Sequence, residues 1–93
     1  MTPRLFLTAA LAVGSASILA VPSTRAQSCE QLWYQRNTIY KQAGYCFRTP
    51  RAISAFGNAG CRYDSEYDVP LSANQRRTVS GIQAQERAFG CPP

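Results

Sequence analysis

The sequence predicts an all-α fold: a small three-helix domain stapled by two disulfides. Apolar residues recur at helical spacing in two long segments, and no segment alternates convincingly at the two-residue period of a strand. Four cysteines follow a leader-like N-terminal segment. The chain has only 93 residues, so a domain that follows such a leader is too short for a large core and needs cross-links.

The N-terminal segment has the pattern of a secretory signal peptide. Arg4 supplies a positive charge, residues 5–21 are apolar and uncharged, and small residues precede a cleavage point after Ala26. We therefore predict a signal peptide over residues 1–26 and a mature domain over residues 27–93.

Two alternatives fit this segment less well. A membrane anchor would need a longer apolar stretch than this one, which is rich in small residues. A lipoprotein anchor at Cys29 would need a different residue set immediately before the cysteine. With the signal peptide removed, we expect no membrane span and a periplasmic or secreted location.

The first helix is predicted over Cys29–Ala43. Ser28 and Gln31 have the spacing of a capping box, and Glu30 would lie in the first turn, where the helix dipole favours negative charge. Gly44 is the residue type that ends helices in a left-handed conformation.

Two further helices are predicted. The shorter spans Pro50–Phe56, because proline is favoured in the first turn of a helix and a glycine-rich stretch follows. Residues 61–71 are predicted to form a loop. Ser72, with a glutamine three residues later, caps a third helix that runs to Phe89 and stops at Gly90.

One charge lies inside the apolar arc of each long helix. Arg36 falls about 40° from Leu32, in the middle of the apolar arc, and Glu86 falls about 20° from Val79. Since an isolated buried charge is costly, we predict that Arg36 and Glu86 form an ion pair. In the alternative, the long Arg36 side chain reaches solvent at the edge of the core.

The four cysteines are predicted to form two disulfides, because their number is even and they follow a signal peptide. No CxxC pair supports a zinc site. Pairing Cys29 with Cys91 in antiparallel helices places the two charges nearly level, about 10 and 8 Å from the bridge. This arithmetic favours Cys29–Cys91 with Cys46–Cys61, and the two other pairings stay open.

Composition argues against several kinds of chemistry. The chain has no histidine, which removes the commonest general base and a major metal ligand. Paired cysteines leave no thiol nucleophile, so we expect neither catalytic residues nor a cofactor. Residues 27–93 carry eight basic and five acidic side chains in scattered positions, and this pattern indicates solubility instead of a nucleic-acid interface.

One acidic segment deserves comparison with known metal loops. Asp64, Glu66 and Asp68 have the initial spacing of a calcium loop, but Val69 stands where that loop needs glycine and Gln75 where it needs glutamate. We therefore expect a solvated loop and no metal.

Exposed tyrosines offer another hypothesis. Tyr63 and Tyr67 lie in the acidic segment, and Tyr34 lies on the polar face of the first helix. Together they would form a platform for stacking on an envelope glycan, or they would simply cover the core.

The first helix and the residues after it resemble the YARHG domain, a small bacterial extracytoplasmic module. Eight positions with fixed spacing carry this resemblance: Leu32, Arg36, Asn37, Ile39, Tyr40, Gly44, Tyr45 and Phe47. The five positions of the naming motif read Tyr40-Lys41-Gln42-Ala43-Gly44, so only its tyrosine and glycine are kept. The paired cysteines suggest a disulfide-bearing branch.

The resemblance implies a helical fold and a role at the cell envelope, with no established reaction. Arg36 and Asn37 then look like a structural polar pair, with Asn37 bonding the backbone of a neighbouring loop. We predict a non-catalytic binding or structural module whose partner is a polymer or protein of the envelope. The alternatives are an envelope-acting enzyme that uses Asp64, Glu66 and Asp68, and a secreted inhibitor or effector of a partner protein.

Overall fold

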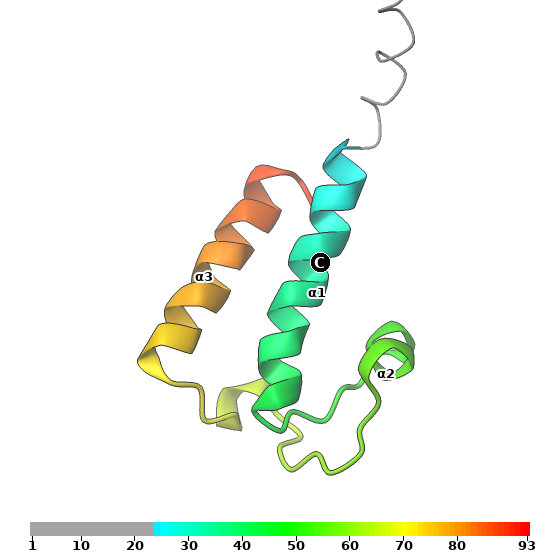
Figure 1. The fold of residues 1–93 in the computed structure, drawn as a ribbon, viewed down its shortest axis with the longest axis vertical. Helices are drawn as coiled ribbons and strands as arrows, with labels where there is room; N and C mark the ends of the chain where they lie inside the picture. The colour runs from blue at the N-terminus through cyan, green and yellow to red at the C-terminus, as the bar shows by residue number, and fades with distance from the viewer. Residues whose placement is uncertain (1–23) are drawn as a thin grey trace, which may run out of the picture.

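The computed structural model describes residues 24–93 of the chain (Figure 1). It contains three α-helices, α1 (Thr24–Gln42), α2 (Pro50–Phe56) and α3 (Ala73–Ala88), and a short 3-10 helix, η2 (Glu66–Asp68). No β-strand lies in this part of the chain, where Tyr45 and Tyr63 form an isolated bridge. The predicted all-α class with three helices and two disulfides is confirmed. Most of the predicted signal peptide, residues 1–23, lies outside the described residues.

Helix α1 is central, with α3 antiparallel beside it and α2 on its other side (Figure 1). The described chain thus consists of two long helices side by side, with the short helix and its loops packed against α1. Within residues 24–93, no helix is both long enough and apolar enough to cross a membrane.

The predicted start of the first helix was wrong. Helix α1 begins at Thr24 and not at Cys29, so Ser28 lies inside the helix and caps nothing. The reason is that nothing between Thr24 and Ser28 breaks a helix: the segment holds neither proline nor glycine. As a consequence, Glu30 is outside the first turn and its carboxylate has a different partner, Arg51.

Both long helices end in the same way. Gly44 and Gly90 have positive φ angles of 97° and 70°, as the prediction of a left-handed residue after each helix requires. In α1, Tyr45 N–H donates to the Tyr40 carbonyl at 3.0 Å. In α3, the equivalent bond runs from Cys91 N–H to the Glu86 carbonyl at 2.8 Å. These are Schellman motifs, and the second one turns Cys91 back toward α1.

The predicted cap of α3 is confirmed. The Ser72 hydroxyl accepts from the Gln75 N–H at 3.1 Å, and the Gln75 side chain accepts from the Ser72 N–H at 2.8 Å. This reciprocal pair satisfies donors that the first turn would otherwise leave unpaired. The helix ends one residue before the predicted Phe89, which is 40% exposed.

A small core lies between the helices. Its buried apolar residues come from every part of the fold and include the buried α3 residues Val79 and Ile82. The others are Leu32, Phe47, Ala52 and Val69. None of these side chains is fully enclosed, as expected for so short a domain. Two disulfides therefore contribute much of the constraint.

The segment predicted as loop over residues 61–71 contains one helical turn. Ser65 caps η2 by accepting a hydrogen bond from the Tyr67 N–H at 3.3 Å. The turn follows from local chemistry, because serine competes for nearby backbone donors. It leads into Val69, which is buried beneath the loop.

Candidate functional site

The structure places Arg36 against Glu86. Arg36 Nε lies 2.8 Å from Glu86 Oε1, and Arg36 Nη2 lies 3.0 Å from Glu86 Oε2. The two side chains are 21% and 11% exposed, so the pair is largely screened from water. A two-bond fork of this kind is the strongest geometry that an arginine and a carboxylate adopt. It joins α1 to α3 about two helical turns along α1 from the Cys29–Cys91 bridge.

The disulfide pairing is the one that was favoured because it places Arg36 and Glu86 nearly level in antiparallel helices. Cys29 and Cys91 join the N-terminal part of α1 to the residue after α3, with Cα atoms 5.5 Å apart. Cys46 and Cys61 close the segment that contains α2, with Cα atoms 5.1 Å apart. Residues 24–93 hold no free cysteine.

Asn37 is buried, but its predicted bond to a neighbouring loop is wrong. Its Nδ2 donates to the Trp33 carbonyl at 2.9 Å, four residues earlier in the same helix. The carbonyl four residues earlier, on the preceding turn, is within reach of a short polar side chain on a helix. Asn37 is therefore a buried polar group satisfied within α1.

The other motif residues build the turn after α1. Tyr45 packs edge-on between Tyr40 and Phe47, with ring centroids 5.7 and 5.2 Å apart. Gly44 accepts two backbone hydrogen bonds, and a Cβ at this position would lie 3.3 Å from the Tyr63 ring. The positive φ and the close approach both favour glycine. These contacts support a structural role for the Gly-Tyr-x-Phe part of the motif.

Asn58 is a structural residue that was not predicted from the sequence. Its side-chain oxygen accepts from the Phe47 N–H at 2.7 Å, and its amide donates to the Phe47 carbonyl at 2.9 Å. One asparagine thus satisfies both backbone groups of a buried residue, as a paired strand would. The only signal is an asparagine between glycines after a helix, and this pattern also fits an ordinary turn.

The three acidic residues of the predicted loop lie on the surface. Asp64, Glu66 and Asp68 are all exposed, with Glu66 and Asp68 in η2 and Asp64 just before its cap, Ser65. Among residues 24–93, no group of three or more histidine, cysteine or acidic side chains is placed to hold a metal ion. The spacing that mimics a calcium loop thus produces a capped turn in this chain.

The three tyrosines of the predicted sugar platform are apart. Tyr34 packs against Phe56 in a tilted arrangement, with ring centroids 4.9 Å apart, on the α2 side of the molecule. Tyr63 contacts Gly44, which is about 15 Å further along the axis of α1. Tyr67 projects from η2 and is 92% exposed. The hypothesis that these three side chains form a single platform is therefore wrong.

The Tyr40 phenol is partly buried. Burial raises the pKa of its phenol above the ordinary value of 10.0, and the nearby Glu66 carboxylate raises it further. The Arg36 guanidinium acts in the opposite direction. The neutral phenol is thus the favoured form in the folded chain.

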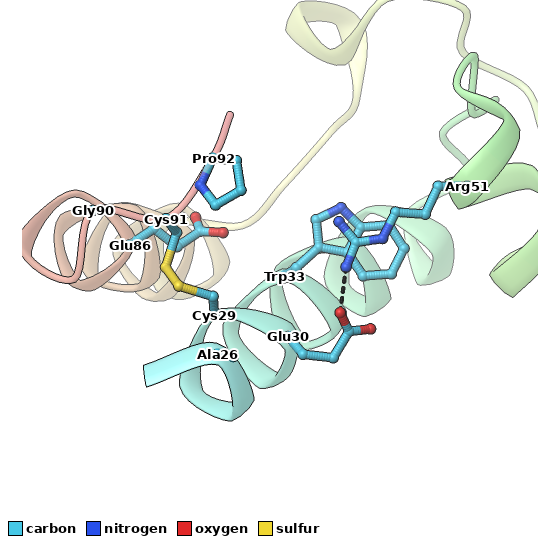
Figure 2. A pocket seen from close by; sticks show the side chains of 9 residues that line it. All are labelled: Ala26, Cys29, Glu30, Trp33, Arg51, Glu86, Gly90, Cys91 and Pro92. Atoms are coloured by element: carbon cyan, nitrogen blue, oxygen red, sulfur yellow. Dashed lines mark hydrogen bonds and ion pairs between the residues drawn. A yellow bond between two sulfur atoms is a disulfide. The ribbon is translucent and has the colours of Figure 1, made fainter. Parts of the chain in front are cut away.

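A groove at the disulfide end is the best candidate for a binding site. Its volume is about 360 Å³, and it opens between the first turns of α1, the start of α2 and the tail after α3 (Figure 2). Arg51 from α2 lies over the Trp33 ring, with the guanidinium carbon 3.8 Å from the ring centroid. Arg51 also pairs with Glu30, and this bond holds the stacked arginine in place (Figure 2).

The opposite wall of the groove is mainly apolar. It comprises the Cys29–Cys91 disulfide, Gly90 and Pro92, with the Glu86 carboxylate beside them (Figure 2). Sequence reasoning did not find this groove, because it depends on where α2 docks. Trp33 and Glu30 share one face of α1, but nothing in the sequence places Arg51 over them.

The fold and its bridges define a small, disulfide-stapled helical domain suited to an oxidising compartment. A model of the YARHG domain matches residues 12–87, and the chain therefore belongs to the YARHG domain family. This family consists of small extracytoplasmic domains of unknown function. Comparisons with curated proteins and with solved structures found no match.

Proposed function

We propose that residues 27–93 form an exported, non-catalytic binding or structural module of the bacterial cell envelope, released by cleavage of the signal peptide after Ala26. Membership of an extracytoplasmic family and two disulfides support export. The predicted cleavage point lies within the first turn of α1, and cleavage removes Ala26 from the lining of the groove, while the other eight lining residues stay in the mature chain.

The groove beside Trp33 is the feature that supports a binding role. Its two carboxylates each have an arginine partner: Glu30 pairs with Arg51, and Glu86 pairs with Arg36. Carboxylates held in this way suit ligand contact more than proton transfer, which needs a group within reach of a reacting proton. The polar motif residues Arg36 and Asn37 bond other groups of the fold: Arg36 bonds Glu86, and Asn37 bonds the Trp33 carbonyl.

Retention on envelope material tests this function. The exported protein, with both disulfides oxidised, should bind to purified envelope fractions and release no soluble fragments from them. Reproducible cleavage of an envelope polymer that disappears when Asp64, Glu66 and Asp68 are replaced by Asn or Gln would instead identify an enzyme. Absence of retention on every fraction would contradict a binding role at the envelope.

A further inference from the structure

We infer that the groove beside Trp33 binds a neutral saccharide containing an N-acetylhexosamine ring. This inference rests on the proposed function, which supplies an extracytoplasmic setting. It goes further by naming the chemical class of the ligand and the residues that contact it.

The charge balance of the groove favours a neutral ligand. Glu86 is buried and receives two hydrogen bonds from Arg36, and Glu30 pairs with Arg51. The four charged groups therefore cancel in pairs. An anionic ligand would face the Glu30 and Glu86 carboxylates that line the groove. A cationic ligand would face Arg51 there, and the two carboxylates that could attract it are already neutralised by Arg51 and Arg36, so either charge carries a cost in desolvation or repulsion.

The rim of the groove offers donors and acceptors together. Among residues 24–93, Glu30 and Arg51 share a single hydrogen bond, from Arg51 Nη2 to Glu30 Oε1. Glu30 Oε2 and further Arg51 N–H groups remain for a ligand, and both side chains are more than half exposed. A hydroxyl both donates and accepts, so two neighbouring hydroxyls of a sugar ring satisfy this pair at once.

The remaining surfaces are apolar and suit the rest of such a ring. Trp33 brings an aromatic ring and one N–H donor, and the stacked Arg51 fixes its position. Across the groove, the disulfide and Pro92 form an apolar wall (Figure 2). An acetamido group has a methyl for that wall and an amide for the polar rim. The volume of about 360 Å³ lies at the lower end of the range for small-ligand sites.

Trp33 also provides the assay, because it is the only tryptophan in the chain. The exported protein is titrated with a neutral N-acetylglucosamine trisaccharide and, in a second arm, with a glucose trisaccharide. We expect a saturable change in Trp33 fluorescence with the first sugar and a weaker one with the second. Amide shift changes in the native protein should centre on residues 29–33 and Arg51.

Variants assign the response to the groove. Arg51→Gln and Glu30→Gln each remove a charge-assisted hydrogen bond and should weaken binding about tenfold or more. Arg62→Gln removes an exposed arginine outside the groove and should leave the affinity unchanged. Circular dichroism establishes that each variant is folded.

Several outcomes would overturn the inference. These are no response to either sugar, an equal response to both, or binding that Arg51→Gln and Glu30→Gln leave intact. If no sugar binds but envelope fractions still retain the protein, only the ligand class is wrong and a protein partner becomes the better assignment. If retention fails as well, the proposed function is wrong too.

Discussion

At the scale of single residues, two asparagines of this domain bond backbone groups in or near the core. The Asn37 side chain donates to the carbonyl of Trp33, and the Asn58 side chain bonds both the N–H and the carbonyl of Phe47. A buried amide or carbonyl without a partner costs more than a typical hydrogen bond contributes. In so small a core, these asparagines should matter as much as apolar contacts do.

Asn58→Ala should therefore destabilise the fold by about 1–3 kcal/mol, because it strands two backbone groups of a buried residue. Asn58→Asp keeps the acceptor and loses the donor, so its loss should be smaller. Denaturant unfolding with the disulfides oxidised measures both. A stability equal to that of the native chain for Asn58→Ala would mean that water replaces the side chain at no cost.

Tyr40 should make the stability depend on alkaline pH. Because the folded state raises the phenol pKa, the unfolded state loses its proton first, at about pH 10. Its contribution is fully present below that pH and is lost as the pH rises through the folded pKa. Denaturant unfolding of the native chain and of Tyr40→Phe across this range should show a shallower decline for the variant. Parallel curves would contradict the assignment.

At the scale of the helices, most of the predicted caps follow from local sequence, and the start of α1 is the exception. Ser72, Gly44 and Gly90 act as the sequence predicts, because each needs only its own neighbours to form a cap. The predicted start of α1 was wrong because Ser28 and Gln31 have the spacing of a capping box but no helix-breaking residue precedes them. A capping-box spacing is thus informative only where the preceding residues resist helix formation.

Ser72→Ala should cost about 1 kcal/mol, since it removes the side-chain acceptor of the capping box in α3. Ser80→Ala, at an exposed position in the middle of the same helix, is the matched control. It should be neutral or slightly stabilising, because alanine is the better helix former. Equal unfolding temperatures for Ser72→Ala and Ser80→Ala would contradict the role of the cap.

At the scale of the whole molecule, the sequence predicted the contacts that follow from helix geometry. The positions of Arg36 and Glu86 inside apolar arcs, together with axial distances to Cys29 and Cys91, led to the antiparallel arrangement of α1 and α3. The groove could not be predicted. It requires the docked position of Arg51, which depends on packing of Phe56 against Trp33 and Tyr34.

Export should leave a chain that starts at Gln27 and contains no reactive thiol. The basis is the signal-peptide pattern and the two disulfides of the described residues. Intact mass and thiol titration of the exported protein check this. A mass that retains residues 1–26, or two or more reactive thiols in the native protein, would rule out the proposed processing.

The central claim is that the charged residue of the family motif holds the two long helices together. Removing either Arg36 or Glu86 leaves the other charge buried without its partner, which should cost about 3–5 kcal/mol. Arg36→Met combined with Glu86→Leu strands neither charge and should lose much less than the sum of the single losses.

A double-mutant cycle, read by thermal unfolding with both disulfides oxidised, is the most direct test. The pair in the structure predicts a large coupling between Arg36→Met and Glu86→Leu, with the double variant more stable than an additive estimate. Strictly additive losses would contradict the claim, because they would mean that the two charges do not depend on each other and that Arg36 is solvated independently of Glu86.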